Sequence, residues 1–340
     1  MKNQSIDTGK LSDYIGHTSQ IGGTQRLIVD EGKGKGTSVI RVRNGIGLDF
    51  TLLPDKGLDI LDIQLGGVQL AWISRNGLVA NSHFNGEGVG WLRSFGGGML
   101  TTCGLRNVGP PEEDQGEHFG LHGRFSGIPA RHVNTTEHWK NGNLFLEVSG
   151  EVSETNVFGE ELVLRRTYRM NSVENTIEMT DKISNQGTGP QQIMLLYHMN
   201  WGFPLLTSSA RMERSPGKVV VRGEDQSEVD LWATFAEPTQ DYSERVYFFD
   251  LEADADGRIF YQLENRSIER GVRVSWSKEQ LPLLTEWKMM GKGDYVLGLE
   301  PGNTLPIGRR GCRDQGQAEF LEAGATKEVS LKIEFLSQLP

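Results

Sequence analysis

Val329-Ser330-Leu331-Lys332-Ile333-Glu334-Phe335 alternates apolar and polar residues without interruption. This period of two is typical of a β-strand, because successive side chains point to opposite faces of a sheet. Thr176–Ile183 has the same alternation, and so do residues 272–276 and 38–43. We therefore expect several strands that each bury one face on a core and expose the other to water.

Glycine-containing pairs stand where these strands should turn. Gly66-Gly67 separates residues 59–65 from 68–72, while Asn141-Gly142 and Asp256-Gly257 each precede a further strand-like segment. Glycine accepts the positive φ that tight hairpin turns require. No stretch longer than about a dozen residues has sustained helical periodicity with caps. The sequence therefore predicts an all-β fold, a large antiparallel β-sandwich.

The chain shows no low-complexity tether and no internal repeat over its 340 residues. We therefore expect a single β-sandwich domain over residues 1–340, with residues 1–20 as an N-terminal extension. The polar, irregular stretch Ser208–Thr239 is expected to be an excursion from the sheets.

Composition excludes several classes of partner. The formal net charge of -10 disfavours nucleic acid and anionic membranes, which attract clustered positive charge. No run approaches the ~20 apolar residues of a membrane span, and Met1–Ser5 has no apolar export region after it, so we expect a cytoplasmic protein. Cys103 and Cys312 lack partners at metal or redox spacing and are expected to be reduced thiols.

Two motif-like segments do not support cofactor or metal binding. The glycine-rich residues 32–36 are followed by a strand-like segment, whereas a phosphate-binding loop needs a helix there. His118 and His122 are four positions apart, and on a helix two histidines at this spacing can bind one metal ion. Gly120 and Gly123 argue against a helix here. We therefore predict neither a metal nor a cofactor.

Three ionisable residues interrupt apolar segments far apart in the chain: Glu300 in Leu-Glu-Pro, His198 in Leu-Tyr-His-Met-Asn, and His122 in Leu-His-Gly-Arg. An isolated histidine after an apolar run is more often a hydrogen-bonded structural residue. Three such groups together are harder to explain, because an unpaired ionisable side chain is costly to bury. Pro301 restricts Glu300 to an extended backbone and thereby fixes how it is presented.

Aromatic and basic residues flank these segments. Trp201 lies near His198 and Trp287 precedes the Glu300 strand. Aromatic faces beside polar groups suit a sugar, which has apolar C–H faces and polar edges. Arg124 and Lys288 are candidate contacts for a carboxylate, phosphate or keto oxygen of a substrate. Arg93 stands just before three consecutive glycines.

The ordered set of motifs resembles the aldose 1-epimerase superfamily, also called galactose mutarotase-like, and in detail an uncharacterised bacterial branch of it. The likeness runs from Leu52-Leu53-Pro54-Asp55 through Thr101-Thr102-Cys103-Gly104 and the His122 and His198 segments to the Glu300 segment. It implies a β-supersandwich with a sugar site in a cleft on one sheet. Glu300 then corresponds to the general base, His198 to the general acid, His122 to a sugar-binding histidine, and Arg93 to an arginine that holds substrate hydroxyls.

Departures from the family pattern leave the substrate open. Tyr197-His198-Met199-Asn200 stands where Asn-His-Ser or Asn-His-Thr is usual, and His122-Gly123-Arg124 replaces His-Gly-Gly. Gly302-Asn303 stands where the family usually has a glutamine.

The resemblance implies a carbohydrate-active isomerase that interconverts sugar anomers without a redox cofactor, with a small-molecule sugar or sugar derivative as its partner. We expect an ionised Glu300 and an imidazolium at His198, which the carboxylate would help to protonate. Two alternatives remain open: an epimerase or isomerase that acts at another sugar carbon, and a non-catalytic sugar-binding protein on the same scaffold. A glycosidase ranks below these because no partner carboxylate for Glu300 is evident.

Overall fold

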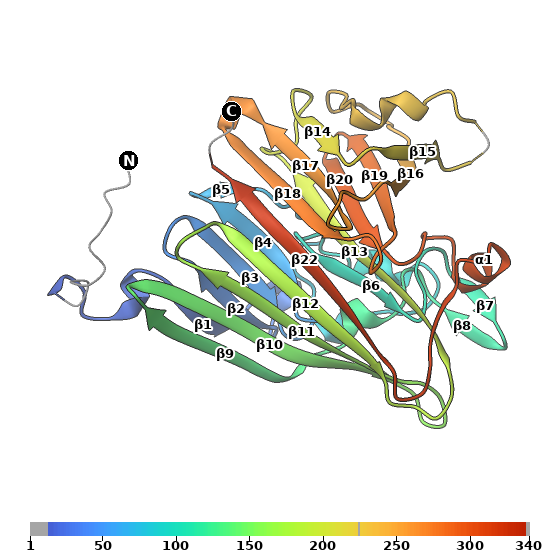
Figure 1. Ribbon diagram of the computed structural model, residues 1–340, viewed down its shortest axis with the longest axis horizontal. Coiled ribbons are helices and arrows are strands. Elements are labelled where there is room, and N and C mark those ends of the chain that lie inside the picture. Colours follow the sequence, from blue (N-terminus) through green and yellow to red (C-terminus); the bar gives the residue numbers. More distant parts are fainter. Residues whose placement is uncertain (1–12, 224, 338–340) are drawn as a thin grey trace.

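The computed structural model describes residues 13–223 and 225–337, and strands dominate it (Figure 1). Residues 1–12 of the expected N-terminal extension lie outside the described residues. Residues 13–20 of the extension contain the 3-10 helix η2 (Thr18–Gln20). Among the described residues no helix is long and apolar enough to cross a membrane.

Three large sheets and one small hairpin contain the strands, and every pairing between named strands is antiparallel. The five-stranded sheet has the order β1 (Gly23–Ile28), β2 (Ser38–Arg43), β3 (Leu48–Leu53), β4 (Asp59–Leu65), β5 (Val68–Gln69). The eight-stranded sheet has the order β14 (Arg211–Arg214), β17 (Arg258–Asn265), β18 (Arg270–Ser277), β22 (Thr326–Leu336), β12 (Thr176–Asn185), β11 (Glu161–Asn171), β10 (Asn143–Thr155), β9 (Arg131–Lys140).

The seven-stranded sheet has the order β15 (Gly217–Val221), β16 (Arg245–Leu251), β19 (Leu283–Gly291), β20 (Asp294–Gly302), β13 (Gln191–Gly202), β21 (Glu319–Leu321), and β6 (Thr101–Leu105) also pairs with β13. The small hairpin is β7 (Glu112–Asp114) with β8 (Glu117–Phe119). Within the described residues the α-helical structure is limited to α1 (Arg309–Asp314). The remaining 3-10 helices are η3 (Gly32–Gly34), η4 (Asn81–His83), η5 (Gly90–Arg93), η6 (Phe125–Gly127), η7 (Val229–Ala233) and η8 (Arg266–Ile268).

The alternating segment at the C-terminal end forms β22, between β12 and β18. Two of its apolar residues stand opposite apolar residues of β12, with Ile333 facing Ile177 and Leu331 facing Met179. These side chains are buried in one large core cluster to which all three large sheets contribute. The predicted all-β sandwich is therefore confirmed.

The predicted turns are present, but one of them has a different role. Gly66-Gly67 closes the β4–β5 hairpin and Asn141-Gly142 closes β9–β10, with positive φ at each of these four residues. Asp256-Gly257 instead connects β16 of the seven-stranded sheet to β17 of the eight-stranded sheet. It is a turn between sheets and not a hairpin.

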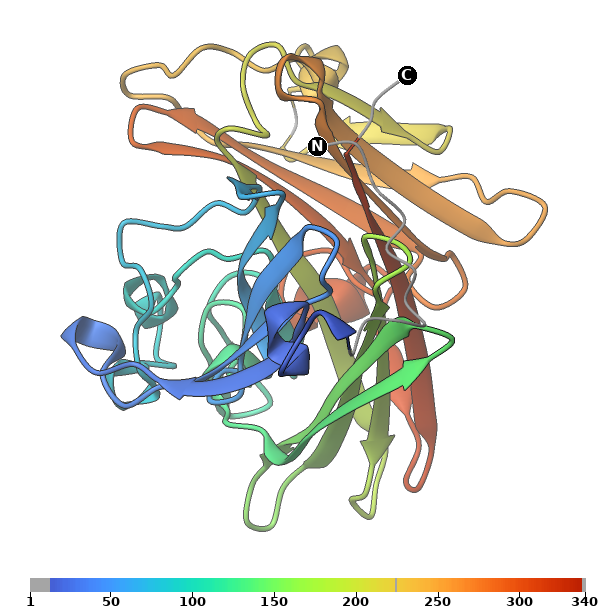
Figure 2. The same ribbon diagram turned by 90° about the vertical axis from the view of Figure 1, so that its left-hand side faces the viewer.

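Two irregular regions flank the seven-stranded sheet. Between β5 and β9 the chain is mostly irregular (light blue to green in Figure 2) and carries η4, η5 and η6. The predicted excursion Ser208–Thr239 includes η7 but also two short strands, β14 and β15, which join the eight- and seven-stranded sheets. Both regions supply residues to the cleft described next.

Candidate functional site

A cleft of about 850 Å³ lies on the seven-stranded sheet. Strands β13, β16, β19 and β20 form its floor, and the irregular segments around residues 72–76, 91–95, 109–110, 121–122 and 306–307 form its walls. His122, His198, Glu300 and Trp287 all line this cleft. The structure therefore brings together the three ionisable groups that the sequence singled out.

Glu300 and His198 are in direct contact on the cleft floor. They lie on the paired strands β20 and β13, and Oε1 of Glu300 is 3.0 Å from Nε2 of His198. Both side chains are almost fully buried, with 3% and 6% of their surface exposed. The contact is not an aligned hydrogen bond, because Oε1 of Glu300 has no hydrogen-bond partner among the described residues, and catalytic contacts of this kind often become aligned only when a ligand is bound.

Burial sets the resting protonation of the pair. It raises the pKa of Glu300 to about 8, with a further contribution from the charge of Glu244. It also lowers the pKa of His198 to about 3, a shift to which His122 adds and which the Asn200 side chain opposes. At neutral pH Glu300 is therefore protonated and His198 neutral. Because burial disfavours both charged forms, its effect is opposite to the resting carboxylate and imidazolium expected from the sequence.

His122 is held as a neutral hydrogen-bond donor. Its Nδ1 accepts a long hydrogen bond of 3.4 Å from the backbone N–H of Gly109, which leaves the ring hydrogen on Nε2. Burial lowers its pKa to about 4. Its ring centroid lies 5.9 Å from that of His198. His122 can therefore donate to a ligand oxygen beside the Glu300–His198 pair.

Aromatic rings surround the reactive pair. The ring centroids of Phe95 and Trp287 lie 5.3 and 5.5 Å from that of His198, and Trp91 packs against His122 at 4.9 Å. Trp72 is in edge contact with Trp287 at 6.3 Å. The cleft thus combines apolar ring faces with a few polar groups, the composition that suits a sugar.

The sequence family described as a domain of unknown function (DUF4432) matches residues 34–335. The chain belongs to this family. A comparison with curated proteins found no match.

Solved structures show what this DUF4432 chain is similar to in fold. A Klebsiella pneumoniae protein, provisionally assigned as an aldose 1-epimerase, has a TM-score of 0.87 at 25% identity, over 93% of this chain and 83% of that one. A galactose mutarotase-like protein from Clostridium acetobutylicum has a TM-score of 0.65 at 15% identity, covering 93% and 99%. A galactose 1-epimerase from Lactobacillus acidophilus has a TM-score of 0.59 at 12% identity, also covering 93% and 99%. The fold is therefore galactose mutarotase-like.

Two of the predicted substrate contacts in the DUF4432 chain face the wrong side of the sheet. Trp201 is fully buried in the core, where its Nε1 donates to the Tyr261 hydroxyl at 3.3 Å. Lys288 is buried, pairs with Glu286 at 3.2 Å, and donates to backbone carbonyls of η7 and its C-terminal end. The prediction was wrong for both residues, because each follows a cleft-facing neighbour by an odd number of positions in its strand.

The two predicted arginines also do not line the cleft. Arg93 ends η5 and is exposed, although Trp91 of the same turn faces the cleft. Arg124 is exposed and lies 3.6 Å from Glu87. Neither side chain is therefore positioned as expected, since irregular turns give no alternation that assigns a side chain to a face.

Charged residues that the sequence did not indicate line the cleft instead. Glu244 accepts hydrogen bonds from Arg222 at 2.6 Å and from the indole of Trp287 at 2.8 Å. Partial burial alone would raise the pKa of Glu244, but these two hydrogen bonds hold it below its usual value. Arg75 pairs with Asp294 at another part of the lining. These residues sit at strand ends and in loops, where no pattern marks them.

Gly298 is a further residue that the sequence did not indicate. It precedes Glu300 on the same face of β20, opposite Trp287. A Cβ atom at this position would lie 2.7 Å from Oε1 of Glu300 and 3.2 Å from Cε1 of His198. The close contact of the reactive pair therefore requires glycine here.

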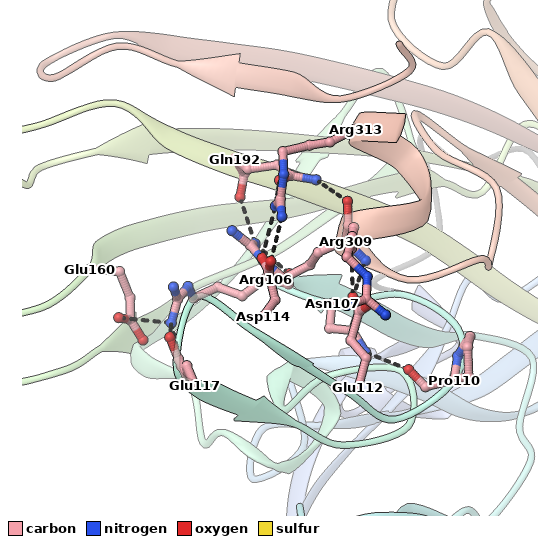
Figure 3. Close-up of polar contacts among 11 residues, drawn as sticks. Arg106, Asn107, Pro110, Glu112, Asp114, Glu117, Glu160, Gln192, Arg309 and Arg313 are labelled. Atoms are coloured by element: carbon pink, nitrogen blue, oxygen red, sulfur yellow. Dashed lines mark hydrogen bonds and ion pairs between the residues drawn. The ribbon is translucent and has the colours of Figure 1, made fainter. Parts of the chain in front are cut away.

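Arginines of helix α1 contact the segment of chain around residues 106–114, which adjoins the wall that carries His122, and Figure 3 shows these contacts. Arg309 is buried, donates to the carbonyls of Arg106 at 2.6 Å and Gln192 at 3.3 Å, and its backbone N–H donates to Glu112. Arg313 donates to Asp114 at 2.8 Å. These contacts join α1 to the segment of chain before and within the β7–β8 hairpin.

The anchored segments meet backbone to backbone beside the cleft. A Cβ on Gly109 would lie 2.4 Å from the carbonyl carbon of Pro306. Asn107 donates to the carbonyls of Pro110 at 3.1 Å and Gly120 at 2.9 Å. Gly109, which donates to His122, is therefore fixed from both sides. Among the residues that the structure describes, no group of three or more His, Cys, Asp or Glu side chains is placed to hold a metal ion.

Proposed function

We propose that this DUF4432 chain is an isomerase that interconverts the anomers of an aldose by acid–base ring opening. The observation that carries the proposal is the 3.0 Å contact between Glu300 and His198 on the floor of an aromatic cleft. The pair holds one proton at neutral pH, and anomer exchange needs one acid and one base. The galactose mutarotase-like fold supports a sugar as the ligand.

The reaction begins when the proton of Glu300 passes to His198 across their contact. The resulting carboxylate accepts the proton of the anomeric hydroxyl, while the imidazolium donates its proton to the ring oxygen. The bond between the anomeric carbon and the ring oxygen breaks, and the anomeric C–O bond becomes a carbonyl. Rotation of the open aldehyde and closure with the roles reversed give the other anomer, and the pair regains its single proton.

His122 and the aromatic wall orient the sugar during this exchange. The Nε2–H of His122 donates to a sugar hydroxyl, and Phe95 contacts a C–H face of the ring. Glu244, held by Arg222, accepts from a further hydroxyl. No electron leaves the substrate, so the sequence of steps balances without an oxidant.

Polarimetry with a panel of freshly dissolved aldoses tests the proposal. We expect the protein to accelerate mutarotation of at least one aldose and Glu300→Gln to lower kcat/KM by about 10²–10⁴-fold. Glu286→Gln is the matched control, because Glu286 is an equally buried carboxyl on β19 that faces away from the cleft. Unchanged activity of Glu300→Gln would reject the assigned base. Sugar binding without exchange would indicate a non-catalytic sugar-binding protein.

A further inference from the structure

We infer that the cleft binds a reducing disaccharide or a longer reducing sugar, with the reducing ring at Glu300 and His198 and the next ring toward Arg75 and Asp294. The inference rests on the proposed function for the position of the reducing ring. The second ring is placed by the length, the aromatic floor and the charged far end of the cleft.

The cleft is longer than one sugar ring. Glu300 and Asp294 lie at opposite ends of β20, and both line the cleft. A strand rises about 3.3 Å per residue, so the cleft extends roughly 20 Å along this strand. A pyranose with its hydroxyl groups spans much less than this. The volume of about 850 Å³ also lies in the upper part of the roughly 300–1,000 Å³ range of pockets for drug-sized ligands.

One indole ring lies on the floor between the two ends, and a second lies beside it on the wall. Trp287 stands opposite Gly298 in the β19–β20 pairing, between the Glu300 end and the Asp294 end. The Nε1–H of Trp287 donates to Glu244 at 2.8 Å, which fixes the orientation of the ring. The ring centroids of Trp72 and Trp287 are 6.3 Å apart. A fixed indole offers an apolar face to the C–H groups of a second sugar ring.

The far end offers donors and acceptors to hydroxyl groups. Nε of Arg75 lies 3.1 Å from Oδ1 of Asp294, and the two side chains are 69% and 38% exposed. An exposed ion pair contributes little to stability, but its guanidinium donates and its carboxylate accepts. A sugar hydroxyl does both, so it can contact both members of the pair. The net charge of the pair is zero, which favours a neutral sugar over an anionic one.

Anomer exchange itself restricts which ring lies at Glu300. Ring opening needs a free anomeric hydroxyl, so the reducing ring must occupy the Glu300 end. The second ring is then attached through one of the other carbons of the reducing ring. Glycosides without a free anomeric hydroxyl would occupy the same space without being exchanged.

The test compares glucose with lactose, cellobiose and maltose, which share a glucose reducing ring and differ in the second ring or its linkage. We expect kcat/KM for exchange of at least one disaccharide to exceed that of glucose at least tenfold. Saturation-transfer NMR should show contact to protons of the non-reducing ring. Arg75→Ala should reduce the preference for the disaccharide at least fivefold, mainly through KM.

Arg41→Ala is the matched control, because Arg41 forms a similarly exposed ion pair with Asp49 on the five-stranded sheet. This variant should leave the preference unchanged. Equal kcat/KM for glucose and all three disaccharides would overturn the inference and leave the proposed function intact. Tighter disaccharide binding with no exchange of any sugar would support the second-ring site and reject the proposed function. Absence of contact to the non-reducing ring would overturn the inference.

Discussion

Glu300 and His198 hold one proton between them because burial makes the charged form of each unfavourable. This proton is the one that the proposed exchange uses. The pair therefore works only while it carries exactly one proton, since the doubly protonated pair has no base and the fully deprotonated pair has no acid.

The pH dependence of exchange follows from these two groups. Glu300 keeps its proton up to about pH 8, and His198 gains a second one only near pH 3. We expect kcat/KM to be flat between pH 5 and 7 and to fall about tenfold per pH unit above about pH 8. Stopped-flow polarimetry from pH 5 to above pH 8 measures this dependence of kcat/KM on pH. A loss of activity centred near pH 6.5 would instead indicate a resting imidazolium and contradict the proposed protonation.

Gly298→Ala tests whether the contact distance matters. The added Cβ would lie 2.7 Å from Oε1 of Glu300, so the carboxyl group must move away from its position. We expect kcat to fall by roughly 10-fold to 10²-fold, because catalysis depends on alignment of the reacting groups. Gly291→Ala is the control, since its Cβ would make only an ordinary contact of 3.4 Å with Met289. Wild-type kcat in Gly298→Ala would argue against a catalytic contact.

The strand alternation explains which site residues were predictable. Glu300 and His198 were found because a polar group inside an apolar strand segment is unusual. Trp287 faces the cleft while its neighbour Lys288 does not, and Trp201 is on the opposite face from His198. Counting positions from His198 along β13 would have excluded Trp201, and counting from Trp287 along β19 would have excluded Lys288. Nothing in the pattern could place Arg75 or Glu244, which lie outside regular strands.

The wall that holds His122 is built from segments without a repeating pattern. The β7–β8 hairpin and helix α1 are separated by most of the chain but are joined by the contacts of Arg309 with Glu112 and of Arg313 with Asp114 (Figure 3). Their pairing depends on long-range charge contacts, which periodicity does not encode. This is why the sequence identified His122 but not the elements that position it.

Arg309→Met tests the anchoring role of α1. The substitution removes the hydrogen bonds to the Arg106 and Gln192 carbonyls, so we expect unfolding to become easier by about 1–3 kcal/mol. Because Gly109 would no longer be fixed against His122, KM should rise several-fold while kcat changes less. Steady-state kinetics and ¹⁵N NMR of the His122 ring measure both effects.

Arg310→Ala is the matched control, because the neighbouring Arg310 is exposed. It should leave stability and kinetics unchanged. If Arg309→Met lowers stability but leaves KM and the His122 ring signals unchanged, the residue has a structural role alone.

Among the described residues, burial raises the pKa values of three glutamates to near neutrality. Burial raises the pKa of Glu154 and Glu286 to about 7 and that of Glu300 to about 8. In the unfolded chain these groups are ionised above about pH 4.5. Between about pH 4.5 and the pKa values of about 7 to 8 in the folded protein, the folded protein therefore binds more protons than the unfolded chain. Its stability must fall as pH rises across this window.

We expect the free energy of unfolding to fall by on the order of 2–3 kcal/mol between pH 6.5 and 8. The buried histidines offset only a small part of this loss: unfolded histidine is half protonated at about pH 6.5 and neutral at about pH 8, whereas His122 and His198 are neutral in the folded protein throughout. Urea titrations at these pH values provide the measurement. The variant Glu154→Gln/Glu286→Gln should flatten the dependence, and stability that rises over this range would refute the assignment.

The sandwich was predictable because the alternation of apolar and polar residues in each long strand indicates which face is buried. The alternation of residues 329–335 and 176–183 was enough to predict strands, and the structure pairs these two segments. The assignment of strands to sheets was not predictable, as Asp256-Gly257 shows. Local turn chemistry fixes the direction of the chain but does not determine which sheet the next strand joins.

Two-dimensional exchange NMR of an active aldose in D₂O tests the proposed chemistry most directly. We predict cross-peaks between the α and β anomers with catalytic amounts of protein, their loss with Glu300→Gln, and no deuterium on any sugar carbon. Deuterium on a carbon next to the carbonyl would contradict anomer exchange as the reaction and show that Glu300 acts on a C–H bond. Equal cross-peaks with wild type and Glu300→Gln would contradict the role of the Glu300–His198 pair.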